Sequence, residues 1–165
     1  MANKQMNHKV RALEDLKRIV ADKSANGKRV VFANGCFDVL HVGHIRYLQE
    51  AKALGDYLVV GLNSDSSVRR LKGDARPVMD QQARASLLSG LECVDAVLIF
   101  EDDTVDRLLI ELKPHFHCKG SDYTPESVPE KETVRSYGGS TSITGGEKIQ
   151  STRWLFEEIK RRRLS

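Results

Sequence analysis

Residues 35–44 of the chain read GCFDVLHVGH, and this stretch joins two segments with different hydrophobic patterns. The apolar run at 30–33 is typical of a buried strand, whereas the spacing of apolar residues from Ile45 to Leu54 indicates an amphipathic helix. The stretch therefore lies where a strand turns into a helix N-terminus. Such an end carries unpaired N–H groups and the positive end of the helix dipole, so it attracts phosphate.

The residue types in this stretch suit the close approach of an anion. Gly35 and Gly43 place no Cβ between the backbone and a phosphate. His41 and His44 lie on one helical face, so both imidazoles can donate to the same anion. A lone histidine is more often a core or surface residue than a catalyst, but two that flank a glycine at such a turn favour function. The pattern predicts a nucleoside triphosphate site with the histidines at the reacting phosphorus.

Alternating strands and helices predict the fold class, a Rossmann-like three-layer α/β/α arrangement with a mostly parallel sheet. We expect strands at 29–34, 57–62, 95–100 and 115–118, and helices at 8–22, 43–54, 80–90, 103–112, 126–136 and 151–162. Ligands of such sheets bind beyond the carboxyl ends of the strands. The histidine stretch, Asn63 to Asp65, and Lys119 to Asp122 each follow an expected strand, so all three are predicted at one edge of the sheet.

The 165 residues, of which 40% are hydrophobic, indicate one globular domain. We expect an N-terminal helix within 1–27, an α/β core at 28–150 and a C-terminal helix within 151–165. The three cysteines are far apart and odd in number, which favours a reducing cytoplasm over a disulfide framework. The apolar runs are shorter than the roughly 20 residues that span a bilayer, and a net charge of +3 is too small to indicate nucleic-acid binding.

Several ordered motifs of the chain resemble the HxGH nucleotidyltransferase superfamily. The matching strings are NGCFD at 34–38, HVGH at 41–44, GLNSD at 61–65, LKG at 71–73, RPV at 76–78 and KGSDYT at 119–124. The resemblance is closest to the adenylyltransferases of ADP-heptose synthesis. It implies transfer of AMP from ATP to D-glycero-β-D-manno-heptose 1-phosphate, by in-line attack on the α-phosphorus, with Mg²⁺ neutralising the triphosphate.

The same resemblance implies the roles of individual residues. His41, His44 and Lys72 would be catalytic, because preplaced donors stabilise the charge that develops on the phosphoryl oxygens. The nucleotide would be bound by Gly35, Cys36, Phe37, Gly43, Lys119, Gly120, Asp122, Ser151, Thr152 and Arg153. The sugar phosphate would be bound by Asp38, Asn63, Asp65, Arg76, Arg84 and Tyr123.

Each of these roles has a structural alternative. Phe37 can fill the core and Asp38 can brace its loop, and we weigh these roles equally with ligand binding. The charged stretch 65–76 can be a solvated helix face, and Arg84 an exposed helix residue. Ser151 can be a simple N-cap.

The loop that begins at Lys119, which we expect to be exposed and mobile, can be an ordinary Asx-type turn. Trp154, Phe156 and the segment 145–148 depart from the pattern of the superfamily.

The run from His115 to Cys118 is interpreted as a strand and not as a metal site. Side chains alternate along a strand, so His117 and Cys118 would point to opposite faces. A second Cys/His pair that would complete a zinc set is missing from the sequence. We therefore predict no protein metal ligands, and a core-facing Phe116 and Cys118.

Two other functions stay open at this stage. The first is the same chemistry with CTP and glycerol 3-phosphate or a similar alcohol phosphate. The second is a nucleotide sensor without catalytic activity, against which the retention of both histidines argues. The resemblance also admits a homodimer, because members of the superfamily often form dimers.

Overall fold

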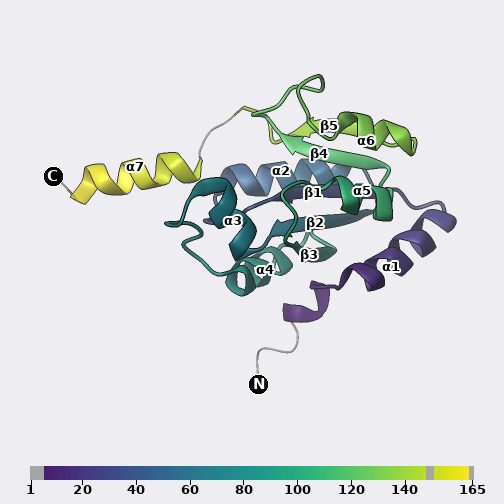
Figure 1. Ribbon diagram of the computed structural model, residues 1–165, viewed down its shortest axis with the longest axis horizontal. Coiled ribbons are helices and arrows are strands. Elements are labelled where there is room, and N and C mark those ends of the chain that lie inside the picture. Colours follow the sequence, from purple (N-terminus) through teal and green to yellow (C-terminus); the bar gives the residue numbers. More distant parts are fainter. Residues whose placement is uncertain (1–5, 148–150, 164–165) are drawn as a thin grey trace.

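The computed structural model describes residues 6–147 and 151–163 and places one sheet between two layers of helices (Figure 1). The strands are β1 (Val30–Gly35), β2 (Tyr57–Asn63), β3 (Ala96–Phe100), β4 (Phe116–Gly120) and β5 (Ser140–Thr144). They follow the order β3-β2-β1-β4-β5, and every neighbouring pair is parallel. The predicted fold class is therefore confirmed.

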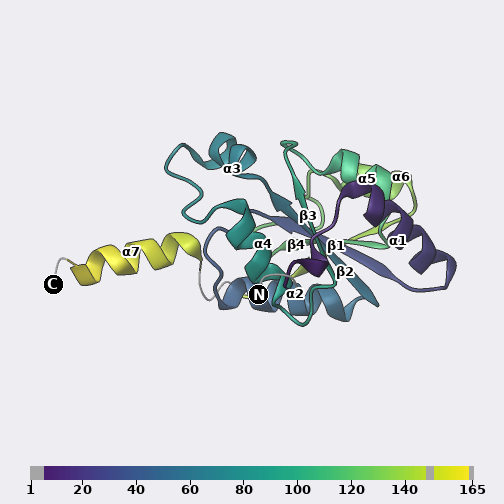
Figure 2. The ribbon, with the colours of Figure 1, turned by 90° about the horizontal axis from the view of Figure 1, so that it is seen from below.

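Helices connect the strands and cover both faces of the sheet (Figures 1 and 2). They are α1 (Leu13–Ala25), α2 (Val42–Ala53), α3 (Asp65–Lys72), α4 (Gln81–Ser89), α5 (Asp106–Leu112), α6 (Lys131–Ser136) and α7 (Thr152–Arg163), with a short 3-10 helix, η1 (Met6–Lys9), before α1. Among the described residues, none of these helices is both long and apolar enough to cross a membrane.

The hydrophobic core has two halves, one on each face of the sheet. Val31 and Ala33 of β1 pack with α2 and α4, whereas Val30 and Phe32 pack with α1 and α5. Alternate residues of the strand therefore enter different halves, as the strand geometry requires. Burial on both faces explains why β1 and β2 are continuous apolar runs and not alternating patterns.

The N-terminal helix begins later than predicted. The expected helix at 8–22 counted Val10 as part of its apolar face, but Val10 instead forms a parallel bridge with Val97 of β3. The backbone N–H of Arg11 donates to the carbonyl of Val97 at 2.9 Å. This contact covers the outer edge of β3 and delays the start of the helix to Leu13.

Three other elements differ from the prediction. Strand β5 and helix α3 were absent from the expected set, because the strand STSIT has one large apolar residue and α3 buries only Ser67 and Val68. Helix α6 is shorter than the predicted helix at 126–136, since residues 121–130 form turns. Helix α7 extends away from the body of the molecule and has no buried residue (Figure 1).

Candidate functional site

A cavity of about 500 Å³ opens where the carboxyl ends of β1 and β4 meet the N-termini of α2 and α7. Every residue predicted as catalytic or as nucleotide-binding lines this cavity. Of the residues predicted for the sugar phosphate, Asp38 and Tyr123 line it as well, whereas Asn63, Asp65, Arg76 and Arg84 do not. The lining follows from the sheet order, because β1 and β4 are neighbours although they are far apart in the sequence.

The two histidines lie on the first turn of α2. His41 is the N-cap residue, and its Nδ1 accepts a hydrogen bond from the backbone N–H of Gly43 at 3.1 Å. With Nδ1 as the acceptor, a neutral His41 carries its proton on Nε2 and can donate it. The imidazole rings of His41 and His44 stack with centroids 3.8 Å apart, and Phe37 packs against His44 at 5.1 Å.

His44 is a neutral group in this environment. Burial, together with the charges of His41 and Lys72, lowers the pKa of His44 from 6.5 to about 3. Its Nδ1 is buried and has no hydrogen-bond partner in the described part of the chain. Buried polar atoms in proteins are almost always paired. Because its ring is neutral near pH 7, His44 can act as an N–H donor or acceptor but not as a cation.

Phe37 and Asp38 both have structural contacts as well as cavity positions. The backbone of Phe37 is left-handed, with φ 44°, and its ring is buried against Tyr47 at a centroid distance of 6.3 Å. Asp38 is 3% exposed and accepts hydrogen bonds from Arg76 at 2.7 Å and from the backbone of Val78 at 2.7 Å. Asp38 thus anchors the segment after α3 to the histidine stretch.

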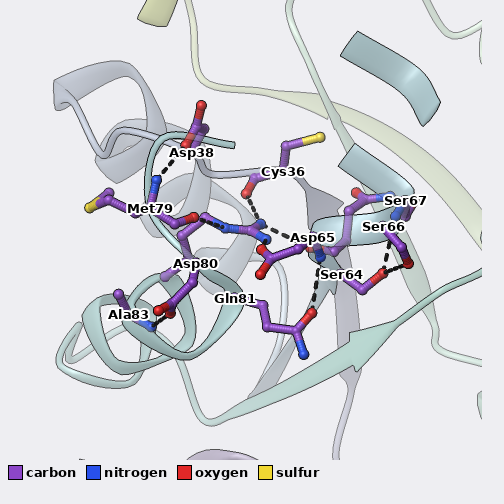
Figure 3. A network of polar contacts seen from close by, with 12 residues as sticks. Cys36, Asp38, Ser64, Asp65, Ser66, Ser67, Met79, Asp80, Gln81 and Ala83 are labelled. Atoms are coloured by element: carbon purple, nitrogen blue, oxygen red, sulfur yellow. Dashed lines mark hydrogen bonds and ion pairs between the residues drawn. The ribbon is translucent and has the colours of Figure 1, made fainter. Parts of the chain in front are cut away.

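Arg84 lies behind the cavity wall. It is fully buried, and its guanidinium donates to the carbonyls of Cys36 at 2.6 Å, Asn63 at 2.9 Å and Met79 at 3.0 Å. It also forms an ion pair with Asp65 at 2.7 Å. Cys36, Asp65 and Met79 converge on this network from three different segments (Figure 3). The interpretation of Arg84 as an exposed helix residue is therefore wrong, because its donors tie the cavity wall to β2 and α4.

Asn63, Asp65 and Arg76 are used for contacts within the protein. The Nδ2 of Asn63 donates to the Ser67 hydroxyl at 2.9 Å, and Asp65 pairs with Arg84. The guanidinium of Arg76 bonds Asp38 and lies 4.1 Å from the ring centre of Phe156 in α7. Asn63 ends β2, Asp65 begins α3 and Arg76 follows α3, but their side chains point into these contacts and none lines the cavity.

Lys119 differs from the expected exposed loop residue. It is the penultimate residue of β4, it is 8% exposed, and its Nζ lies 3.1 Å from Glu130 Oε1. Its ammonium also lies 5.0 Å from the ring centre of Tyr123. The cavity wall at this end is therefore an ordered part of the sheet, and the following residues Gly120 to Tyr123 continue it.

Two exposed cations also line the cavity. Lys72 is the last residue of α3 and is exposed, and Arg153 lies on the first turn of α7. Ser151 accepts a hydrogen bond from the backbone N–H of Trp154 at 3.1 Å. Ser151 is therefore the N-cap of α7, as its structural alternative predicted. A second helix N-terminus therefore faces the cavity beside these two cations.

Further residues line the cavity without having been predicted. They are Asn34, Tyr47, Ser121, Thr144, Gly145 and Glu147. Asn34 and Tyr47 adjoin predicted residues in the histidine stretch and α2, so neighbourhood in the sequence would have found them. Thr144 ends β5 and Gly145 follows it, and only a prediction of that strand would have placed them at this edge.

His117 and Cys118 point to opposite faces of β4, as alternation requires. Cys118 and Phe116 belong to the core half under α2, whereas the Nε2 of His117 donates to Asn34 Oδ1 at 2.9 Å on the other face. Within residues 6–147 and 151–163, groups of three or more His, Cys, Asp or Glu side chains suited to a metal ion do not occur.

Comparisons with known proteins support one family. Residues 32–162 match the model of the cytidylyltransferase-like family. The chain is similar to the bifunctional protein HldE of Pelobacter propionicus, with 48% identity over 162 residues that make up 98% of this chain and 33% of that protein. HldE of Geobacter metallireducens is 50% identical over 153 residues, which cover 93% of this chain and 31% of that protein. The chain spans about a third of the length of these relatives.

Two solved structures are similar to the fold. The lipopolysaccharide core biosynthesis protein of Thermoplasma volcanium is 34% identical with a TM-score of 0.60, covering 71% of this chain and 94% of that one. The pantoate–β-alanine ligase of Francisella tularensis, crystallised with β,γ ATP and β-alanine, is 16% identical with a TM-score of 0.59, covering 81% of this chain and 65% of that one. The second likeness concerns the fold alone.

Proposed function

Because this chain belongs to the cytidylyltransferase-like family, we propose that it transfers AMP from ATP to D-glycero-β-D-manno-heptose 1-phosphate, giving ADP-heptose and pyrophosphate. The similarity to HldE proteins and to a lipopolysaccharide core biosynthesis protein supports a heptose substrate. The observation that carries the reaction class is the stacked pair of His41 and His44 at a helix N-terminus inside the cavity.

In this proposal the substrates react by direct displacement. An oxygen of the sugar phosphate attacks the α-phosphorus of ATP, the bond to the β-phosphate oxygen breaks, and pyrophosphate leaves. The attacking phosphate is already an anion at neutral pH, so the protein need not supply a strong base. The N–H groups of the two imidazoles and the ammonium of Lys72 stabilise the negative charge that builds on the phosphoryl oxygens.

In this proposal the two exposed cations, Lys72 and Arg153, have the same role, which is to bind the triphosphate. Lys72, Arg153 and the N-termini of α2 and α7 all line the cavity, so in this proposal they bind the triphosphate. Mg²⁺ would neutralise part of the triphosphate charge. Because the described residues form no cluster of three metal ligands, we expect the ion to arrive bound to ATP.

A second candidate function is favoured by the family description itself. A cytidylyltransferase-like cavity would use CTP with glycerol 3-phosphate or a similar alcohol phosphate. A matrix of ATP and CTP against both phosphates, with products identified by mass and pyrophosphate measured in parallel, separates the two. ADP-heptose as the main product supports the proposal, and a tenfold faster reaction of CTP with glycerol 3-phosphate contradicts it. A protein that binds nucleotide but releases no pyrophosphate in any combination would be a sensor.

A further inference from the structure

One wall of the cavity contains a buried ion pair that the proposed reaction does not use. Lys119 Nζ lies 3.1 Å from Glu130 Oε1, and the two side chains are 10% and 7% exposed. Lys119 lines the cavity, whereas Glu130 lies behind it, directly before α6. Removing two charges from water costs energy that their attraction often fails to return. Stabilisation of the fold alone is therefore a weak explanation for the presence of this ion pair.

Two neighbouring side chains, those of Glu130 and Tyr123, hold the ammonium of Lys119 in place. Glu130 accepts one hydrogen bond from Lys119 through Oε1, while Oε2 is buried and has no hydrogen-bond partner among the described residues. The ring of Tyr123 lies 5.0 Å from Nζ and favours a cation over its face. An ammonium has three N–H donors, so donors remain after the bond to Glu130. Lys119 can therefore donate to a ligand from a defined position.

The net charge of this wall differs from that around Lys72 and Arg153. The carboxylate of Glu130 offsets the charge of Lys119, and Asp122 adds a negative group. Asn34, on the same wall, receives a hydrogen bond on Oδ1 from His117 and keeps an uncharged amide NH₂. Lys72, at the end of α3, and Arg153, on the first turn of α7, also line the cavity, and both are exposed and pair with no buried carboxylate in the described part of the chain. Phosphate groups are thus favoured near these two cations, and uncharged hydroxyl groups at the wall of Lys119.

We infer that Glu130 is a positioning residue that holds Lys119 as a hydrogen-bond donor to substrate hydroxyl groups and keeps it from acting as a cation for phosphate. The inference rests on the proposed function and extends it, because it assigns different lining residues of the cavity to different parts of the substrates. Glu130 acts through Lys119 and does not touch the substrates.

The test compares a charged probe with uncharged probes. Tripolyphosphate carries charge without hydroxyl groups, while adenosine and free D-glycero-D-manno-heptose carry hydroxyl groups without charge. In the Glu130→Gln variant Lys119 loses its counter-charge, so tripolyphosphate should bind about three- to tenfold more tightly by calorimetry. At least one uncharged probe should bind several-fold more weakly by ligand-observed NMR. Glu132→Gln, at an exposed position on α6, is the matched control and should match the wild type with all three probes.

A double variant keeps the inference testable if Glu130→Gln does not fold. Lys119→Met with Glu130→Leu removes both charges together, a change that buried ion pairs often tolerate. It should keep wild-type affinity for tripolyphosphate and lose affinity for an uncharged probe. If it loses tripolyphosphate instead, or if Glu130→Gln weakens all probes alike, the inference is wrong. These measurements need no turnover, so a protein that shows the predicted binding but makes no ADP-heptose would refute the proposed function alone.

Discussion

The imidazole rings of His41 and His44 lie face to face, with centroids 3.8 Å apart and planes inclined by 25°. At this separation a positive charge on one ring disfavours the protonated, charged form of the other ring. His41 contributes in this way to the low pKa of His44, after burial. The pair therefore provides N–H donors and not two positive charges. Among the residues that line the cavity, positive charge comes instead from Lys72, Lys119, Arg153 and the N-termini of α2 and α7.

His44→Ala should lower kcat by about 100- to 1,000-fold, because its N–H acts on charge that develops only in the transition state. The affinity for ATP should change much less. Steady-state kinetics with ATP and heptose 1-phosphate, together with calorimetric binding of ATP, measure both quantities. Arg46→Ala, at an exposed position on the same helix, is the control and should keep wild-type kinetics. Near-normal kcat in a folded His44→Ala protein would contradict the catalytic role.

Lys72→Ala should weaken binding of ATP and of tripolyphosphate without lowering the free energy of unfolding, because Lys72 is exposed at the end of α3. Losing one charge contact to a phosphate should cost about 1 to 3 kcal/mol of binding. Calorimetry gives the affinity and urea denaturation gives the stability. A variant with reduced stability and unchanged affinity would make Lys72 a structural residue.

Arg84→Met should destabilise the fold by about 3 to 5 kcal/mol, since it leaves the carboxylate of Asp65 and three carbonyl groups without their donor. Urea denaturation measures the loss. Arg70→Met is the matched control, because Arg70 is half exposed and pairs with Asp103 on the surface. That change should cost less than about 1 kcal/mol. Equal effects of the two substitutions would show that the buried network is not important for stability.

His117 should make the protein less stable as the pH falls. Burial, with the charge of Lys119 nearby, lowers the pKa of His117 from 6.5 to about 3. Below pH 6.5 the unfolded chain therefore binds a proton that the folded chain excludes, and stability decreases. By about pH 5 this single group should cost about 2 kcal/mol. His117→Phe should remove that part of the loss, as measured by urea denaturation at both pH values, and parallel pH profiles of the two proteins would contradict the assignment.

The sequence predicted the fold best where a long apolar run or an ordered set of family motifs was present. Four strands were predicted within about two residues of their observed bounds, because burial on both faces produces long apolar runs. The family resemblance is confirmed by the match over residues 32–162. Strand β5 was missed because Ser and Thr dominate it and it lies at the edge of the sheet, where fewer side chains are buried.

The direction of individual side chains was harder to predict than their location. Arg84 and Asp65 lie close to the cavity, as motif positions indicated, but they face each other. Lys119 lies on the expected edge of the sheet, yet its ammonium is buried against Glu130, which is eleven residues away in the sequence. Such pairs depend on how the segment before α6 lies against β4, and a local pattern carries no information about that arrangement.

The pairing of β1 with β4 brings Asn34 and Lys119 into one cavity across 85 residues of sequence. Contacts between such distant segments form late, since the intervening chain must first lose its freedom. A nucleotide that touches both strands therefore recognises only molecules that have completed this step of folding. At a concentration 100 times its Kd, such a ligand would add about 2.7 kcal/mol to the free energy of unfolding. In a growing cell, the supply of ATP would then also determine how many copies of this chain persist in the assembled state.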